Sequence, residues 1–193
     1  PFITYLAEKN AYSLKDKLTP IGVAFYIAPF VNAIVRSGTQ EEKELVFKSM
    51  LSFIAFDTVP STKRGHNFGE KVVEQAVRTA ANVKARQTKI QNEGMLLLED
   101  MIQKQDLLKH QVLLFLLEPG QIDSNIIGLC GNKIMAKYQR PVCVLTKHTD
   151  KIQHQYEDFP NVIVDEYRYT YQGSARGCDK VGINDFKSIC AAT

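Results

Sequence analysis

The chain has 193 residues, of which 45% are hydrophobic and 23% charged, and its formal net charge is +3 at pH 7. This composition is typical of a folded globular protein and excludes a disordered or low-complexity chain. No run of about 18 uninterrupted apolar residues occurs, so we expect no membrane partner. A net charge this small does not by itself indicate nucleic-acid binding.

The two ends of the chain do not resemble natural termini. The first residues, Pro1 to Leu6, include no initiator Met, basic leader or small-residue cleavage site. We therefore expect the sequence to be a part of a longer chain. Four cysteines contain no C-x-x-C pair and are expected to pack as small hydrophobes in a reducing, cytoplasmic setting, without structural zinc. They are Cys130, Cys143, Cys178 and Cys190.

Helical patterns fill residues 1–110. Pro20 opens an apolar run over 21–28, which predicts a short buried helix. An amphipathic helix is predicted over 40–53, and the Gly- and Pro-containing residues 57–69 indicate a loop. From about residue 70 to 103 apolar positions recur at three- and four-residue steps without proline. This predicts one helix about 50 Å long.

The pattern changes after residue 110 to that of a small α/β domain. Apolar runs predict strands at 112–117, 141–145 and 162–164, the last continued by alternating tyrosines to residue 171. A helix is predicted over 124–138, a surface loop around His148 and His154, a glycine turn over 173–182 and a final helix after Asn184 or Asp185. The predicted fold is α/β: a helical connector over 1–110, then a mixed-sheet domain over 111–193 that ends before it is complete.

Positive charge is concentrated in one segment. Residues 61–89 contain seven basic and two acidic side chains, whereas 1–60 is balanced. Arg78, Arg86 and Lys89 lie off the apolar stripe of the long helix. They are either a track for a polyanion or a solvated helix face, and the charge pattern alone favours the solvated face.

Three segments carry candidate binding residues, and none contains a catalytic centre. Asn32 and Arg36 share one face of an apolar helix, so they are either bonded internally or directed at a ligand. Lys133 follows two glycines near the start of the 124–138 helix. Gly173, Ser174 and Arg176 could offer backbone N–H groups, a hydroxyl and a guanidinium to a phosphate, or form a plain glycine turn with a solvated arginine, which the spacing alone favours. No D-x-D, metal-ligand spacing, P-loop or G-x-S-x-G occurs, so we expect no metal site.

These segments, in this order, resemble the RecJ branch of the DHH phosphoesterase superfamily. Residues 27–38 resemble its Pro-x-x-Asn-Ala-x-x-Arg motif, with Pro29, Asn32, Ala33 and Arg36 in place. Residues 128–145 resemble its glycine, basic, Lys-Tyr, Arg-Pro and apolar-strand segment. Residues 173–176 resemble its Gly-Ser-[Gly/Ala]-Arg turn, with Phe186 in the following helix.

The resemblance implies a fold and an activity. The fold is a helical connector followed by a DHH-associated domain, and the activity is 5′-to-3′ hydrolysis of single-stranded DNA in DNA repair and recombination. Two metals, manganese or magnesium, would be held by a DHH domain of the same chain that lies outside this sequence. Asn32 and Arg36 would face the scissile phosphate, and Ser174 and Arg176 would hold a nucleotide phosphate. We expect this part alone to bind single-stranded DNA but to be inactive.

Two departures from the family and two alternatives stay open. Ile34-Val35 stands where the family has small residues, and Gly177-Cys178 where it commonly has serine. The chain could instead be part of a DHH-type phosphodiesterase for small nucleotides, which needs little basic track. It could also be a nucleic-acid-binding module without catalysis.

Overall fold

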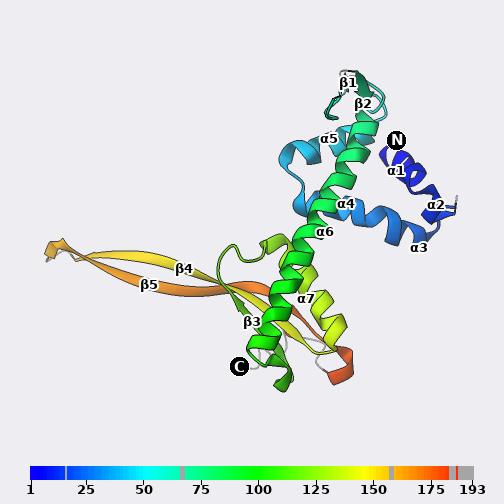
Figure 1. Cartoon of the computed structure of the whole chain (residues 1–193). Helices are drawn as coiled ribbons and strands as arrows, with labels where there is room; N and C mark the ends of the chain where they lie inside the picture. The colour runs from blue at the N-terminus through cyan, green and yellow to red at the C-terminus, as the bar shows by residue number, and fades with distance from the viewer. Residues whose placement is uncertain (16, 66–67, 157–158, 183–185, 187–193) are drawn as a thin grey trace. The chain divides into compact units, whose positions relative to one another are not determined.

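The computed structural model describes residues 1–15, 17–65, 68–156, 159–182 and 186. Its packing divides the chain into two compact units, Pro1–Lys89 and Ile90–Thr193. One helix, α6 (Val72–Lys104), contributes its first part to unit 1 and its second part to unit 2 (Figure 1). The long helix predicted over residues 70–103 is therefore confirmed. The boundary predicted between residues 110 and 111 follows the end of this helix, whereas the packing division falls inside it.

Unit 1 is mainly helical. Its helices before α6 are α1 (Phe2–Lys9), α2 (Ala11–Leu14), α3 (Pro20–Gly22), a π-helical turn η1 (Val23–Ile27), α4 (Ala28–Ser37) and α5 (Gln40–Met50). Thr39 begins α5 with a capping box, in which its hydroxyl accepts from the Glu42 N–H and its own N–H donates to the Glu42 carboxylate. A short antiparallel pair, β1 (Thr58–Pro60) and β2 (Gly69–Lys71), lies in the segment predicted to be a loop.

The helix predicted to be buried over residues 21–28 forms but is mostly exposed. Thr19 caps it by accepting from the Gly22 N–H, as expected for a helix that proline opens. Ile27 is only 2% exposed, but Ile21 and Phe25 are 72% and 71% exposed. The prediction of burial was wrong because an apolar composition does not say whether another part of the protein covers the helix.

One helical stretch of unit 1 also meets a test for membrane spans. Residues Pro20–Ser37 are long and apolar enough to cross a bilayer by length and composition. A core helix of a soluble protein or a signal sequence can have the same length and apolar composition, so these two properties do not establish a membrane span. Asn32 and Arg36 lie within this stretch, and a charged side chain at the centre of a bilayer is costly.

Unit 2 is a three-stranded mixed sheet packed against helices. Strand β3 (Leu113–Leu117) pairs in parallel with β4 (Val142–Tyr156), and β4 pairs antiparallel with β5 (Phe159–Arg176). Helix α7 (Ser124–Tyr138) connects β3 to β4, as the sequence predicts for two parallel strands. Short 3₁₀ turns, η2 (Leu107–Lys109) and η3 (Asp179–Val181), precede β3 and follow β5.

One face of this sheet carries the core of unit 2. Alternate residues of β3 are buried, and Val142 and Val144 of β4 join them below α7 and the second part of α6. A Cβ atom at Gly94 would lie 3.1 Å from the Cys130 sulfur, so glycine lets α6 approach α7 closely. Burial raises the pKa of the Cys130 thiol, with the nearby Lys133 cation opposing the shift. Cys130 and Cys178 are free thiols.

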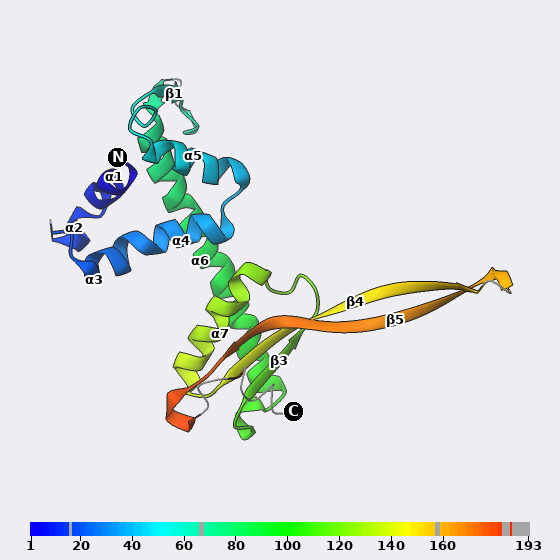
Figure 2. The ribbon, with the colours of Figure 1, turned by 180° about the vertical axis from the view of Figure 1, so that it is seen from behind.

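Two sequence predictions for unit 2 were wrong. Residues 147–156, predicted as a loop, continue β4 beyond its partner β3 and form a long two-stranded ribbon with β5 (Figures 1 and 2). Gly173 is not in a turn, because it pairs with Leu145 inside β5. In both cases backbone pairing across the ribbon overrides the polar or glycine composition that suggested a break. The predicted final helix lies outside the described residues except for Phe186.

Candidate phosphate-binding site

The predicted residues Ser174 and Arg176 lie on one strand and meet helix α7. Both belong to β5, and they pair with Val144 and Val142 of β4, whose side chains are buried toward α7. Directly opposed residues of an antiparallel pair direct their side chains to the same face. Ser174 and Arg176 therefore face α7, where both are partly buried.

Gly128 of α7 provides the space that the arginine occupies. A Cβ atom at this position would lie 2.7 Å from Arg176 Nη2 and 3.3 Å from Ser174 Oγ. A Cβ at Gly131, one turn further along, would lie 3.8 Å from Arg176 Cγ, which is ordinary contact. Gly128, and not Gly131, is therefore the glycine that the guanidinium requires.

Asn132 holds the guanidinium in place. Arg176 Nε donates to Asn132 Oδ1 at 2.6 Å, and Nη1 donates to the Ala175 carbonyl at 2.7 Å. Both acceptors are neutral, and no described carboxylate forms an ion pair with Arg176. Nη2 donates to no other described residue. Arg176 is thus fixed in orientation while no carboxylate in the described part of the chain neutralises its charge, which suits recognition of an anion.

The sequence interpretation missed Asn132. It is four residues from Gly128 and so lies on the same face of α7. The four-residue spacing from Gly128, together with an amide oxygen that can accept from an arginine, was the sequence feature that could have identified Asn132.

Gly173 has a structural role that differs from the predicted one. A Cβ atom there would overlap the Val144 carbonyl oxygen, so β5 approaches β4 too closely for any side chain. Its backbone is part of the sheet and does not form the expected series of free N–H groups. Lys133 is exposed on α7 and forms no ion pair with a described residue.

The two candidate residues of unit 1 are directed outward. Asn32 and Arg36 are exposed on α4, while Ala33 and Ile34 between them are buried. Neither side chain makes a hydrogen bond to a residue within the described ranges. Of the two alternatives that the sequence left open, internal bonding is therefore not what the structure shows.

Of the basic side chains in the first part of α6, Arg78 and Arg86 form ion pairs within unit 1, whereas Lys89 is exposed and forms none with a described residue. Arg78 forms an ion pair with Glu70, which also pairs with Lys63 at 3.3 Å. Arg86 pairs with Glu42 at 2.8 Å and donates to the Ser37 carbonyl. The Glu42 carboxylate raises the pKa of Arg86. These bonds hold the arginines in place but also neutralise the charge that a polyanion would meet.

Metal ligands do not gather in the described part of the chain. No group of three His, Cys, Asp or Glu side chains there could hold a metal ion. The described residues therefore do not form a site for the two metals that the resemblance implies.

The described residues define a class of protein: an α/β unit with an arginine that is held in orientation and has no described carboxylate partner, joined through one long helix to a helical unit. No family model matches the chain. It is 29% identical over 189 residues to the SPbeta prophage-derived YorK of Bacillus subtilis (strain 168), which is named as a candidate single-strand DNA-specific exonuclease. The same identity relates it to yorK of Bacillus phage SPbeta, which carries the same description.

The similarity covers 97% of this chain but only 30% of each relative. The resemblance to single-strand DNA-specific exonucleases that the motifs predicted is confirmed along nearly the whole chain. The chain spans less than a third of the length of these relatives.

Proposed function

We propose that this chain is the part of a RecJ-like exonuclease that grips single-stranded DNA. The observation that carries the proposal is the Arg176 guanidinium, held by Asn132 and left without a carboxylate partner among the described residues. A planar, fixed arginine binds a phosphate through two parallel hydrogen bonds. Ser174 lies beside it over the same glycine and adds a hydroxyl.

Hydrolysis itself would be performed elsewhere in the complete protein. The metals, manganese or magnesium, would activate water at a DHH domain of the same chain, outside the present sequence. The large exposed apolar side chains of unit 1 support a further packing partner, since exposed apolar surface of this extent usually marks an interface. They include Tyr12, Ile21, Phe25, Phe53 and Phe68, all more than 70% exposed.

The experiment is binding of fluorescent single-stranded oligonucleotides to the 193-residue chain at several salt concentrations. Each phosphate contact contributes about 0.7 to the slope of log affinity against log salt. Arg176→Ala and Arg36→Ala should each weaken binding and lower this slope by about that amount. A salt-independent affinity, or unchanged affinity in both variants, would contradict the gripping role.

The dependence of affinity on oligonucleotide length distinguishes strand gripping from the principal alternative, a phosphodiesterase for small nucleotides. A phosphodiesterase for small nucleotides would bind a dinucleotide as tightly as it binds a longer oligonucleotide. A strand-gripping protein gains affinity with length, because more phosphates are contacted. Measuring the affinity for oligonucleotides of two, six and fifteen nucleotides decides between them.

A further inference from the structure

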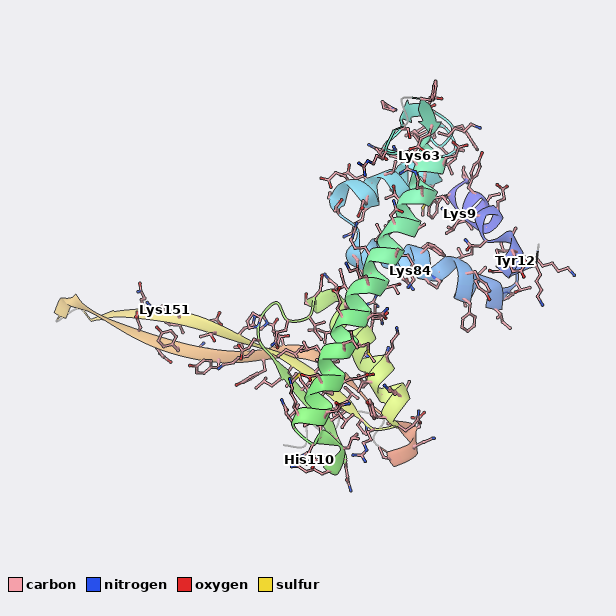
Figure 3. The ribbon with its side chains drawn as sticks, viewed as in Figure 1. Lys9, Tyr12, Lys63, Lys84, His110 and Lys151 are labelled. Carbon is pink, nitrogen blue, oxygen red and sulfur yellow. The ribbon has the colours of Figure 1, made fainter. Side chains whose placement is uncertain are left out.

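The two-stranded part of β4 and β5 has one face that differs from the other. Beyond the last residue paired with β3, Lys147 pairs with Tyr171, Thr149 with Tyr169, and Lys151 with Tyr167. These six residues lie on the same face. Side chains two residues apart on a strand point to the same side, and directly opposed residues of an antiparallel pair share that side. We call this surface the tyrosine face. Figure 3 labels Lys151 on the ribbon.

The three tyrosines are regularly placed and accessible. Tyr167, Tyr169 and Tyr171 are 53%, 53% and 51% exposed. Successive tyrosines are two residues apart, which corresponds to about 6.8 Å along an antiparallel strand. The ribbon therefore presents a row of aromatic rings rather than a single exposed side chain.

Basic side chains lie among these rings. Lys147 Nζ is 4.2 Å from the centroid of the Tyr169 ring, a cation–π contact. Lys151 pairs with Asp165 at 2.8 Å, and that ion pair, with a hydrogen bond from Gln153, lowers the pKa of the Asp165 carboxyl. Asp165 is thus compensated on its own face, whereas Lys147 has no carboxylate partner among the described residues.

The charge differs between the two faces of the ribbon. The tyrosine face carries Lys147, Lys151 and Asp165 among its described charged residues. The opposite face carries Asp150, Glu166 and Arg168, so carboxylates predominate there. Among the described residues, the tyrosine face therefore has one more cation than carboxylates, whereas the opposite face of the ribbon has one more carboxylate than cations.

We propose that the tyrosine face is a second nucleic-acid contact, at which bases of a single strand stack on Tyr167, Tyr169 and Tyr171. Aromatic rings arranged in a row with nearby cations are how proteins bind single strands without reading their sequence. The proposal rests on the proposed function, because it takes single-stranded DNA as the ligand. It adds a site on the ribbon that is distinct from the cluster of Ser174 and Arg176.

Cross-strand Lys–Tyr pairs also stabilise the ribbon itself, and a two-stranded ribbon is only marginally stable alone. The test must therefore separate stacking from ribbon stability. Tyr169→Ala removes the ring, whereas Tyr169→Phe keeps the ring and removes the hydroxyl. Arg168→Ala is the matched control, because it removes a cation from the adjacent position on the opposite face.

The assay is anisotropy of a fluorescein-labelled fifteen-nucleotide oligo(dT) bound by the 193-residue chain. Stacking of one base is worth about 1–3 kcal/mol, so Tyr169→Ala should weaken binding about fivefold or more. The salt slope should not change, since no phosphate contact is removed. Tyr169→Phe should bind oligo(dT) nearly as tightly as the unmodified chain. Arg168→Ala should weaken the affinity less than twofold.

A second readout uses the absence of tryptophan from the sequence. Tyrosine emission can be followed directly, and oligo(dT) should quench it less in Tyr169→Phe than in the unmodified chain. Far-UV circular dichroism of each variant checks that the ribbon has not unfolded.

Three results would overturn the proposal. If Tyr169→Ala binds normally while Arg176→Ala binds weakly, the tyrosine face is not a contact, although the proposed function stands. If the unmodified chain does not bind at low salt, both fail. If Tyr169→Ala changes the molecular mass measured by light scattering and not the DNA affinity, the face binds a second copy of the chain.

Discussion

Gly128→Ala is expected to reduce DNA binding without reducing stability. The added Cβ would lie 2.7 Å from Arg176 Nη2, so the guanidinium must move away from its position above α7. The obstructing group is the far end of a flexible side chain, which can move at little cost. The glycine lies inside a helix, where alanine is favoured by about 0.8–1.0 kcal/mol.

Gly128→Ala should change the free energy of unfolding less than it changes the free energy of DNA binding. The displaced arginine loses its hydrogen bond to Asn132, a net contribution of about 1 kcal/mol at an exposed site. That loss approximately offsets the helix gain, so the free energy of unfolding should change by less than about 1 kcal/mol. Binding loses a charged hydrogen-bond donor worth about 1.5–3 kcal/mol, which corresponds to a roughly ten- to 150-fold weaker affinity.

Gly131→Ala is the matched control on the same helix. Its Cβ would meet Arg176 Cγ, Val144 and Val142 at 3.8–4.0 Å, which is ordinary contact. It should therefore gain the helix stabilisation and leave DNA affinity unchanged. Urea unfolding followed by circular dichroism and oligo(dT) anisotropy measure the two quantities. If Gly128→Ala binds as well as Gly131→Ala, the assignment of Arg176 to the phosphate site is refuted.

Other substitutions test the remaining contacts. Asn132→Asp places a carboxylate against Arg176, so the chain should fold normally while its oligonucleotide affinity decreases more than in Asn132→Ala; equal affinities of the two variants would show that neutralising the arginine has no effect. Burial opposes ionisation of Glu70, but hydrogen bonds from Arg78 and Lys63 outweigh it and hold the pKa of its carboxyl below the usual value. The stabilisation from Glu70 should therefore be complete above about pH 5 and be lost as the pH falls through the lowered pKa, and Glu70→Gln should flatten that dependence in urea titrations at several pH values. Arg86→Ala should cost less than about 1 kcal/mol of stability, because its ion pair with Glu42 is partly exposed and so screened by solvent, and Arg36→Ala should cost none; thermal unfolding of the two variants checks this order.

Elements whose burial is regular could be predicted from the sequence. The apolar run of β3 and the periodic residues of α6 and α7 gave nearly the observed bounds, because their side chains face a core formed within the chain. The outer part of β4 could not be predicted this way. Both of its faces meet solvent in the described structure, so polar residues such as His148 and Asp150 produce no apolar alternation.

The candidate site was predicted in part. Ser174 and Arg176 could be selected because their residue types suit a phosphate. The sequence could not predict which residues these side chains contact. The contact between Arg176 and Asn132 joins residues 44 positions apart, and it depends on β5 continuing as a strand where a glycine suggested a turn.

The regular pairing of β4 with β5 restricts how the ribbon can vary in length. Deleting one residue from either strand would reverse the face of every side chain beyond the deletion, because strand side chains alternate with a period of two. Loss of Arg168 alone, for example, would separate Tyr167 from Tyr169 and place them on opposite sides. Insertions and deletions that keep the tyrosines in one row must therefore remove or add residues in pairs, with a matching change in the facing strand. Homologous proteins with shorter or longer ribbons should show this even-numbered pattern.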